Sequence, residues 1–126
     1  KGHPERISIT KMLDISDIIY INQDLNVNVH LNNGDVLKDV NITLKKWEQT
    51  LLEGNIQCFQ KIHRQTIVNL NFANGIKPDS ERIDGYLALF KESNDQLPIG
   101  GRHFLNAFKE AIKTGKRVPP KFDELK

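Results

Sequence analysis

Residues 58–70 read Cys58-Phe59-Gln60-Lys61-Ile62-His63-Arg64-Gln65-Thr66-Ile67-Val68-Asn69-Leu70, and this stretch decides the fold. Its apolar side chains can be buried by strands that flank a tight turn, and they are Phe59, Ile62, Ile67, Val68 and Leu70. Five further side chains can donate hydrogen bonds and remain available to solvent, namely Lys61, His63, Arg64, Gln65 and Asn69. The stretch therefore predicts an apolar framework that presents groups suited to phosphates or base edges.

The segment from Lys61 to Asn69 resembles the signature (R/K)-(I/V)-H-R-S-(Y/F)-(I/L)-V-N of the LytTR domain. This family comprises mostly β DNA-binding output modules of many bacterial response regulators, which act in two-component systems. Residues 17–34 resemble the family's opening dI.yIe...YV.vhl.dG, and Leu97 to Phe104 resembles its closing lPVSRR. The resemblance covers roughly residues 5–113 and implies an elongated set of small antiparallel sheets with few helices.

Three departures from the family pattern bear on binding. Gln65-Thr66 replaces the usual Ser-aromatic step, and the loop from Asn22 to Asn26 is about one residue short and lacks its aromatic residue. Gly100-Gly101 stands where Ser-Arg is expected, so that only Arg102 of the paired arginines is present.

Composition limits the chain to one domain without a membrane span. The 126 residues are 38% hydrophobic and 27% charged, which is ordinary for a globular protein. No stretch approaches the ~20 apolar residues of a membrane helix, so we expect a soluble, cytoplasmic protein without membrane partners. The net charge is only +2, so the distribution of basic residues has to support any nucleic-acid hypothesis.

The elements expected from periodicity alternate between strands and two helices. Strands are expected at residues 7–10, 18–21, 26–31, 36–40, 67–72, 75–77, 86–90 and 97–99. Helices are expected after Thr43 and over Arg102 to Lys113, and a short capped turn is expected over residues 13–17. We predict a linker remnant at 1–4, a DNA-binding domain at 5–114 and a tail at 115–126. The resemblance to the LytTR family implies a receiver or sensor domain upstream.

The resemblance implies that three segments contact duplex DNA. Arg64 is the first candidate for reading a base, because its guanidinium can donate to guanine O6 and N7 together. His63 either accompanies it or holds the loop by a hydrogen bond, and Asn69 fits either a base contact or satisfaction of the backbone. The polar loop residues of the first segment are Asn22, Gln23, Asp24 and Asn26, although an ordinary turn explains them as well.

Sequence-independent contacts are expected from further cations. Lys61, Arg102 and Lys113 are candidates for phosphates, while a solvated helix face would equally explain Lys113. The family implies repeated half-sites bound by a pair of protomers, with dimerisation through the upstream domain.

Catalysis has little support in this sequence. The four histidines are scattered, Cys58 is alone, and no glycine-rich phosphate loop or metal motif occurs, so no cofactor, metal or catalytic residue is expected. The rival to DNA binding is a protein-interaction or dimerisation module, in which Gly101 marks lost DNA contacts.

Overall fold

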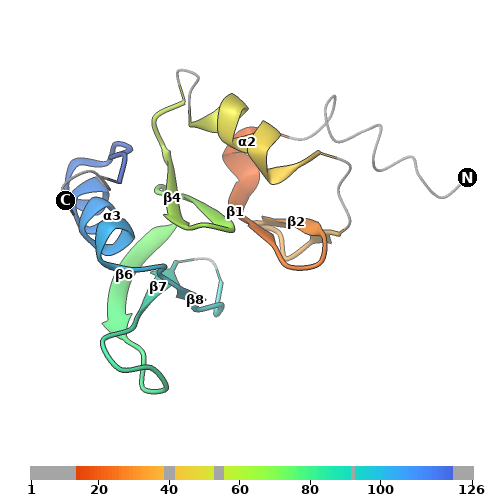
Figure 1. The fold of residues 1–126 in the computed structure, drawn as a ribbon. Helices are drawn as coiled ribbons and strands as arrows, with labels where there is room; N and C mark the ends of the chain where they lie inside the picture. The colour runs from red at the N-terminus through yellow and green to blue at the C-terminus, as the bar shows by residue number, and fades with distance from the viewer. Residues whose placement is uncertain (1–13, 39–41, 53–55, 92, 121–126) are drawn as a thin grey trace, which may run out of the picture.

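The protein is described from a computed structural model, which covers residues 14–38, 42–52, 56–91 and 93–120 (Figure 1). Two helices and eight strands occur in these ranges, together with a 3-10 helix. Their order is η1 (Ile15–Asp17), β1 (Ile18–Gln23), β2 (Val27–Leu31), β3 (Val36–Leu37), α2 (Leu44–Leu51), β4 (Phe59–His63), β5 (Thr66–Asn69), β6 (Ala73–Pro78), β7 (Tyr86–Phe90), β8 (Leu97–Pro98) and α3 (Arg102–Thr114). The prediction of a mostly β chain with few helices is confirmed.

The strands form two antiparallel sheets. The first has the order β3-β2-β1-β5-β4, so that β1 lies at its centre, and the second has the order β6-β7-β8. β1 pairs with β2 through the first hairpin and with β5, whose residues come more than forty positions later in the chain. The five-stranded sheet therefore places two segments predicted to contact DNA, residues 22–26 and the turn with His63 and Arg64, next to each other.

Opposite faces of the five-stranded sheet pack into different apolar clusters. Tyr20 and Val68 belong to a cluster with the second sheet and α3, whereas Ile21 and Ile67 belong to a cluster with α2. These neighbours lie in different clusters because side chains of a strand alternate between its faces. Ile19 shares the cluster of Tyr20, at the irregularity in the pairing of β1 with β2 between Ile18 and Tyr20. Figure 1 shows α2 beside β1 and α3 beside β4, in agreement with their contacts.

The first half of the chain follows the sequence prediction closely. Asp14 caps η1 by accepting a hydrogen bond from the Ser16 N–H, and Thr43 caps α2 by accepting from Lys46 N–H. Gly34 has a positive φ of 94° in the turn between β2 and β3, as expected for an Asn-Gly hairpin signal. β3 covers Val36–Leu37 and Lys38 is not part of it, while residues 39–40 of that predicted strand and the strand expected at 7–10 lie outside the described residues.

Asn69 ends β5 three residues earlier than predicted. Its side chain is fully buried: Nδ2 donates to the Ile18 carbonyl at 2.9 Å, and Oδ1 accepts from the Asn71 N–H at 2.9 Å. The second bond turns the chain, and the Phe72 N–H then donates to the Asn69 carbonyl. The backbone role of Asn69 is thus present, and the expectation that this side chain is available to solvent is wrong.

The C-terminal half is organised around α3. Phe104 and Phe108 are buried on the predicted stripe, and Gly115 ends the helix with a left-handed φ of 75°. Beyond it, the Val118 N–H and carbonyl bond the buried side chain of Gln60 at 2.8 Å each. Part of the segment predicted as a tail therefore packs against β4. None of the described helices is long and apolar enough to cross a membrane.

Replacing Asn69 with alanine should destabilise the fold by about 1–3 kcal/mol, because a buried carbonyl and a backbone N–H lose their partner. Urea unfolding of Asn69→Ala measures this cost. The matched control is the exposed Asn74→Ala, which should stay within about 0.5 kcal/mol of the wild type. Equal effects of the two changes would contradict the assigned role of Asn69.

Candidate nucleic-acid interface

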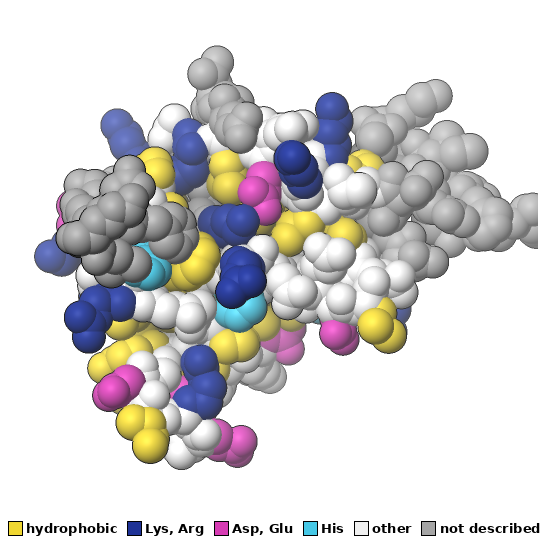
Figure 2. All heavy atoms as spheres, viewed as in Figure 1, with side chains coloured by type: hydrophobic (Ala, Val, Ile, Leu, Met, Phe, Trp, Pro, Cys, Tyr) yellow, Lys and Arg dark blue, Asp and Glu magenta, His cyan; other side chains and the backbone are white. Residues whose placement is uncertain are grey.

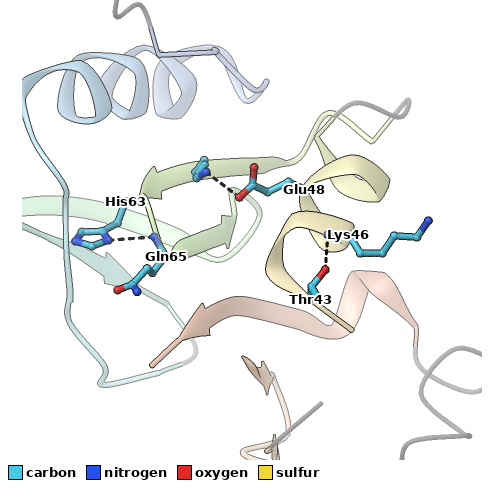
Figure 3. Close-up of polar contacts among 6 residues, drawn as sticks. Thr43, Lys46, Glu48, His63 and Gln65 are labelled. Carbon is cyan, nitrogen blue, oxygen red and sulfur yellow. Dashed lines mark hydrogen bonds and ion pairs between the residues drawn. The ribbon is translucent and has the colours of Figure 1, made fainter. Parts of the chain in front are cut away.

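The turn between β4 and β5 consists of Arg64 and Gln65, and both side chains are exposed. His63 precedes it as the last residue of β4 and is half-buried. Its Nδ1 accepts a hydrogen bond from the Gln65 N–H at 3.2 Å (Figure 3). His63 therefore holds the turn while Arg64 is left available for a ligand.

The protonation of His63 follows from this bond. Burial lowers the pKa of His63 below its ordinary value, and the positive charges of Arg64, Arg82 and Lys61 lower the pKa further. A neutral ring with an acceptor at Nδ1 carries its proton on Nε2. The loop-holding role of His63 is thus present, since Nδ1 fixes the turn. The contact of His63 with DNA stays a prediction.

The first predicted segment lies beside this turn. The Gln23 N–H donates to the Gln65 carbonyl at 2.9 Å, which continues the pairing of β1 with β5. Asn22 and Gln23 belong to β1 and are half-buried, so their placement in a loop is corrected, whereas Asn26 lies in the exposed connection. Asn22 Oδ1 lies 3.1 Å from His30 Nε2, and this partner was not predicted.

The start of α3, which carries the predicted phosphate contact Arg102, also meets this turn. The Gly100 N–H donates to the Ile62 carbonyl at 2.8 Å, which places the start of α3 against the end of β4. A hollow between them is lined by His63, Arg64, Gln65, Gly100, Gly101, His103 and Phe104. Arg102 is the first residue of α3 and is exposed at the rim of an adjoining hollow.

The two glycines that depart from the family pattern have different surroundings. A Cβ on Gly100 would lie 2.8 Å from the Phe104 ring and 3.2 Å from the His63 Cα, so this position is filled by its neighbours. A Cβ on Gly101 would meet nothing within 4 Å, and its φ of 173° is extended. Gly100 thus permits close contact of α3 with β4, whereas nothing in the structure requires glycine at 101.

Two of the cations predicted to contact phosphates are not free at this surface: Lys61 is in an ion pair, and Lys113 lies at the far end of α3. Lys61 Nζ forms an ion pair with Glu48 of α2 at 2.8 Å, so the expectation that it is freely available to solvent is corrected (Figure 3). Lys113 lies in the last turn of α3, about 16 Å along the axis from Arg102 at 1.5 Å per residue. Arg64 and Arg102 are therefore the predicted cations that the structure brings close to the turn.

Basic side chains gather on this side of the molecule. Figure 2 shows several Lys and Arg side chains over the middle of the face, with a His and one acidic side chain among them, and further Lys and Arg towards its edges. Arg82 was missed by the sequence reasoning; its charge contributes to the lowered pKa of His63 although the two residues are far apart in the chain. Its Nε donates to Asp79 Oδ2 at 2.7 Å and its Nη2 to the Tyr86 carbonyl at 3.0 Å. No local pattern marks this residue, because its position depends on the β6–β7 hairpin.

Among the described residues, no group of His, Cys, Asp or Glu is arranged to hold a metal ion. The Asp79 carboxylate accepts hydrogen bonds from Arg82 Nε and from the Glu81 N–H.

Comparisons with known proteins agree with this arrangement. A family model described as the LytTr DNA-binding domain matches residues 8–113. Among solved structures, a LytTr DNA-binding domain assigned to a methyl-accepting/DNA response regulator of Bacillus cereus is 21% identical, with a TM-score of 0.55. The similarity covers 75% of this chain and 80% of that one, and it shows a shared fold. No curated protein matches the sequence.

Adding one methyl group at Gly100 should reduce the folding free energy, whereas adding a small side chain at Gly101 should leave it nearly unchanged. Gly100→Ala is expected to lose about 1–3 kcal/mol of folding free energy, because the methyl group overlaps the Phe104 ring and the β4 backbone. Gly101→Ser should stay within about 0.5 kcal/mol of the wild type. Urea unfolding of both variants checks this, and an equally stable Gly100→Ala would refute the close approach of α3 to β4.

Proposed function

Because the chain belongs to the LytTr DNA-binding domain family, we propose that it binds duplex DNA sequence-specifically as the output domain of a bacterial transcriptional regulator. The observation that carries this proposal is the meeting of three segments at one end of the five-stranded sheet. They are the end of β1 with its connection to β2, the β4–β5 turn, and the start of α3.

Arg64 is proposed to read a base in the major groove. Its side chain is exposed in a turn whose backbone is held by the sheet and by His63, so the backbone of the turn needs little ordering on binding. The planar guanidinium can donate to guanine O6 and N7 together. The Nε2–H of His63 and the amides of Asn22, Gln23 and Asn26 would add donors close to the same base pairs.

Phosphate contacts are proposed at the margins of this surface. Arg102 lies at the N-terminus of α3, where helix N–H groups and the helix dipole also favour an anion. Lys113 can reach only a flanking phosphate, since it lies at the other end of α3. Lys61 is proposed to contact phosphate only by exchanging its partner Glu48, so we assign it the smallest share.

The lone domain is expected to bind weakly. A single copy lacks the avidity of two protomers on repeated half-sites, and the proposed partner domain for dimerisation lies upstream. A fusion of two copies through a flexible linker would restore that avidity.

Selection from a random duplex library at low salt, repeated with Arg64→Ala, tests the proposal. The wild type should enrich a motif, and Arg64→Ala should lose the preference at one position and weaken the best site by about 5- to 150-fold, which corresponds to 1–3 kcal/mol. Lys113→Ala is the matched control: the motif should persist, while the negative slope of log affinity against log salt should become shallower by about 0.9 for the one lost phosphate contact.

An unenriched pool from both the single domain and the fused dimer would contradict DNA recognition and favour the interaction module. A motif unaffected by Arg64→Ala would contradict the assigned base reader alone.

Restoring an arginine at position 101 should strengthen DNA binding, because the site is open and lies beside Arg102. Gly101→Arg is expected to steepen the salt slope by about 0.9 and to raise affinity at low salt. Gly101→Gln, of similar length without charge, serves as the control in the same fluorescence anisotropy titration. If Gly101→Arg binds no better than Gly101→Gln, position 101 does not face the DNA backbone.

A further inference from the structure

We propose that Leu25 is a specificity-determining residue that contacts the C5-methyl group of a thymine in the major groove. This inference rests on the proposed function and deepens it, because it assigns a base to the connection between β1 and β2. Leu25 lies at the tip of that connection, between Asp24 and Asn26. Its polar neighbours were predicted to contact DNA, whereas Leu25 was not.

The side chain of Leu25 touches almost nothing in the protein. It is 91% exposed, and in the described part of the chain only Ile83, at 96%, is more exposed among the large apolar residues. Leu25 belongs to neither of the two apolar clusters. A single exposed leucine is ordinary on a protein surface, so the position of Leu25 has to support the inference.

That position lies beside the proposed base reader. Gln23 pairs with Val27 across β1 and β2, so that three residues form the tip. The Gln23 N–H also donates to the Gln65 carbonyl at 2.9 Å, which ties the base of the tip to the β4–β5 turn. The tip that carries Leu25 therefore begins next to the turn that carries Arg64.

The charge of the connection favours a base edge over a phosphate. Residues 22–26 contain no cation, and the Asp24 carboxylate would be repelled by a phosphate. The other three polar side chains of this segment are uncharged amides, which suit base edges. A segment of this composition gains most in the groove, away from the sugar-phosphate backbone.

Leu25 and thymine match in chemistry. Leu25 is the one apolar side chain in residues 22–26. The apolar group that base edges present in the major groove is the C5-methyl group of thymine. Because Leu25 is exposed in the free protein, contact with this methyl group removes apolar surface from water without breaking any packing inside the fold.

Replacement of each thymine of the selected motif by deoxyuridine tests the inference, because it removes the methyl group and keeps the Watson–Crick hydrogen bonds of the base. In fluorescence anisotropy titrations, the wild type should lose about fourfold in affinity at one position, as expected for one buried methyl group. Leu25→Ala should bind the thymine and deoxyuridine duplexes equally well at that position. Its own selected motif should lose the preference for thymine there.

Two further variants serve as controls. Leu25→Met keeps a long apolar side chain and should still distinguish thymine from deoxyuridine. Ile83→Ala removes an equally exposed apolar side chain from the β6–β7 connection and should bind like the wild type. Unfolding midpoints should be unchanged in all three variants, because the altered side chains make few contacts in the folded protein.

Several results would overturn the inference while leaving DNA binding intact. They are a Leu25→Ala variant that still loses affinity when the same methyl group is removed, a wild type that binds every deoxyuridine duplex as tightly as the parent duplex, and a motif without thymine. An effect of Ile83→Ala equal to that of Leu25→Ala would overturn it as well. Absence of any enriched motif from the single domain and the fused dimer would instead contradict the proposed function, on which the inference rests.

Discussion

The pairing of β1 with β5 is the constraint on which the rest of this molecule depends. Tyr20, Ile21 and Asn22 lie opposite Val68, Ile67 and Thr66, and the Gln23–Gln65 hydrogen bond continues the ladder to the edge of the turn. A slip of one residue would exchange the faces of Tyr20 and Ile21, which pack into different apolar clusters. The two cores thus fix the register, and the register fixes which polar groups meet at the end of the sheet.

A second constraint brings α3 to the same place. Its first turn is tied to β4 through the Gly100–Ile62 hydrogen bond, and the buried Phe104 occupies the volume that a side chain at position 100 would need. The turn between β4 and β5 is thereby held from the sheet, from the helix and by His63 within it. These contacts hold the backbone that carries the exposed Arg64, and a backbone held in place reduces the ordering cost of a contact with DNA.

The sequence predicted what depends on local pattern. Alternation located β7 at its observed bounds, the Asn-Gly turn located the hairpin of β2 and β3, and helical spacing located α3 to within one residue. The signature from Lys61 to Asn69 identified the family, and the three segments expected to bind DNA are adjacent in the structure. These features are encoded by residues that lie close together in the chain.

Contacts between distant residues could not be predicted in this way. Lys61 pairs with Glu48, Arg82 lies within electrostatic reach of His63, and Val118 bonds Gln60 because of strand register and tertiary packing. In the sequence, His30 is only one of four scattered histidines. Its stack on Tyr20 and its hydrogen bond to Asn22 depend on strand pairing and leave no signal in the local sequence. The contacts that support the proposed DNA-binding surface therefore could not be predicted from the local sequence. The exposed residues of that surface, such as Arg64, could be predicted.

The most direct test of the account is a titration of the nitrogen-15-labelled domain with its selected duplex at low salt, followed by amide chemical shifts. The account predicts that the shifts concentrate in three segments at once, residues 22–26, 63–65 and 100–103, with little change in α2. Shifts confined to one segment, or centred on α2 or the β6–β7 hairpin, would contradict a single DNA-binding surface at this end of the sheet.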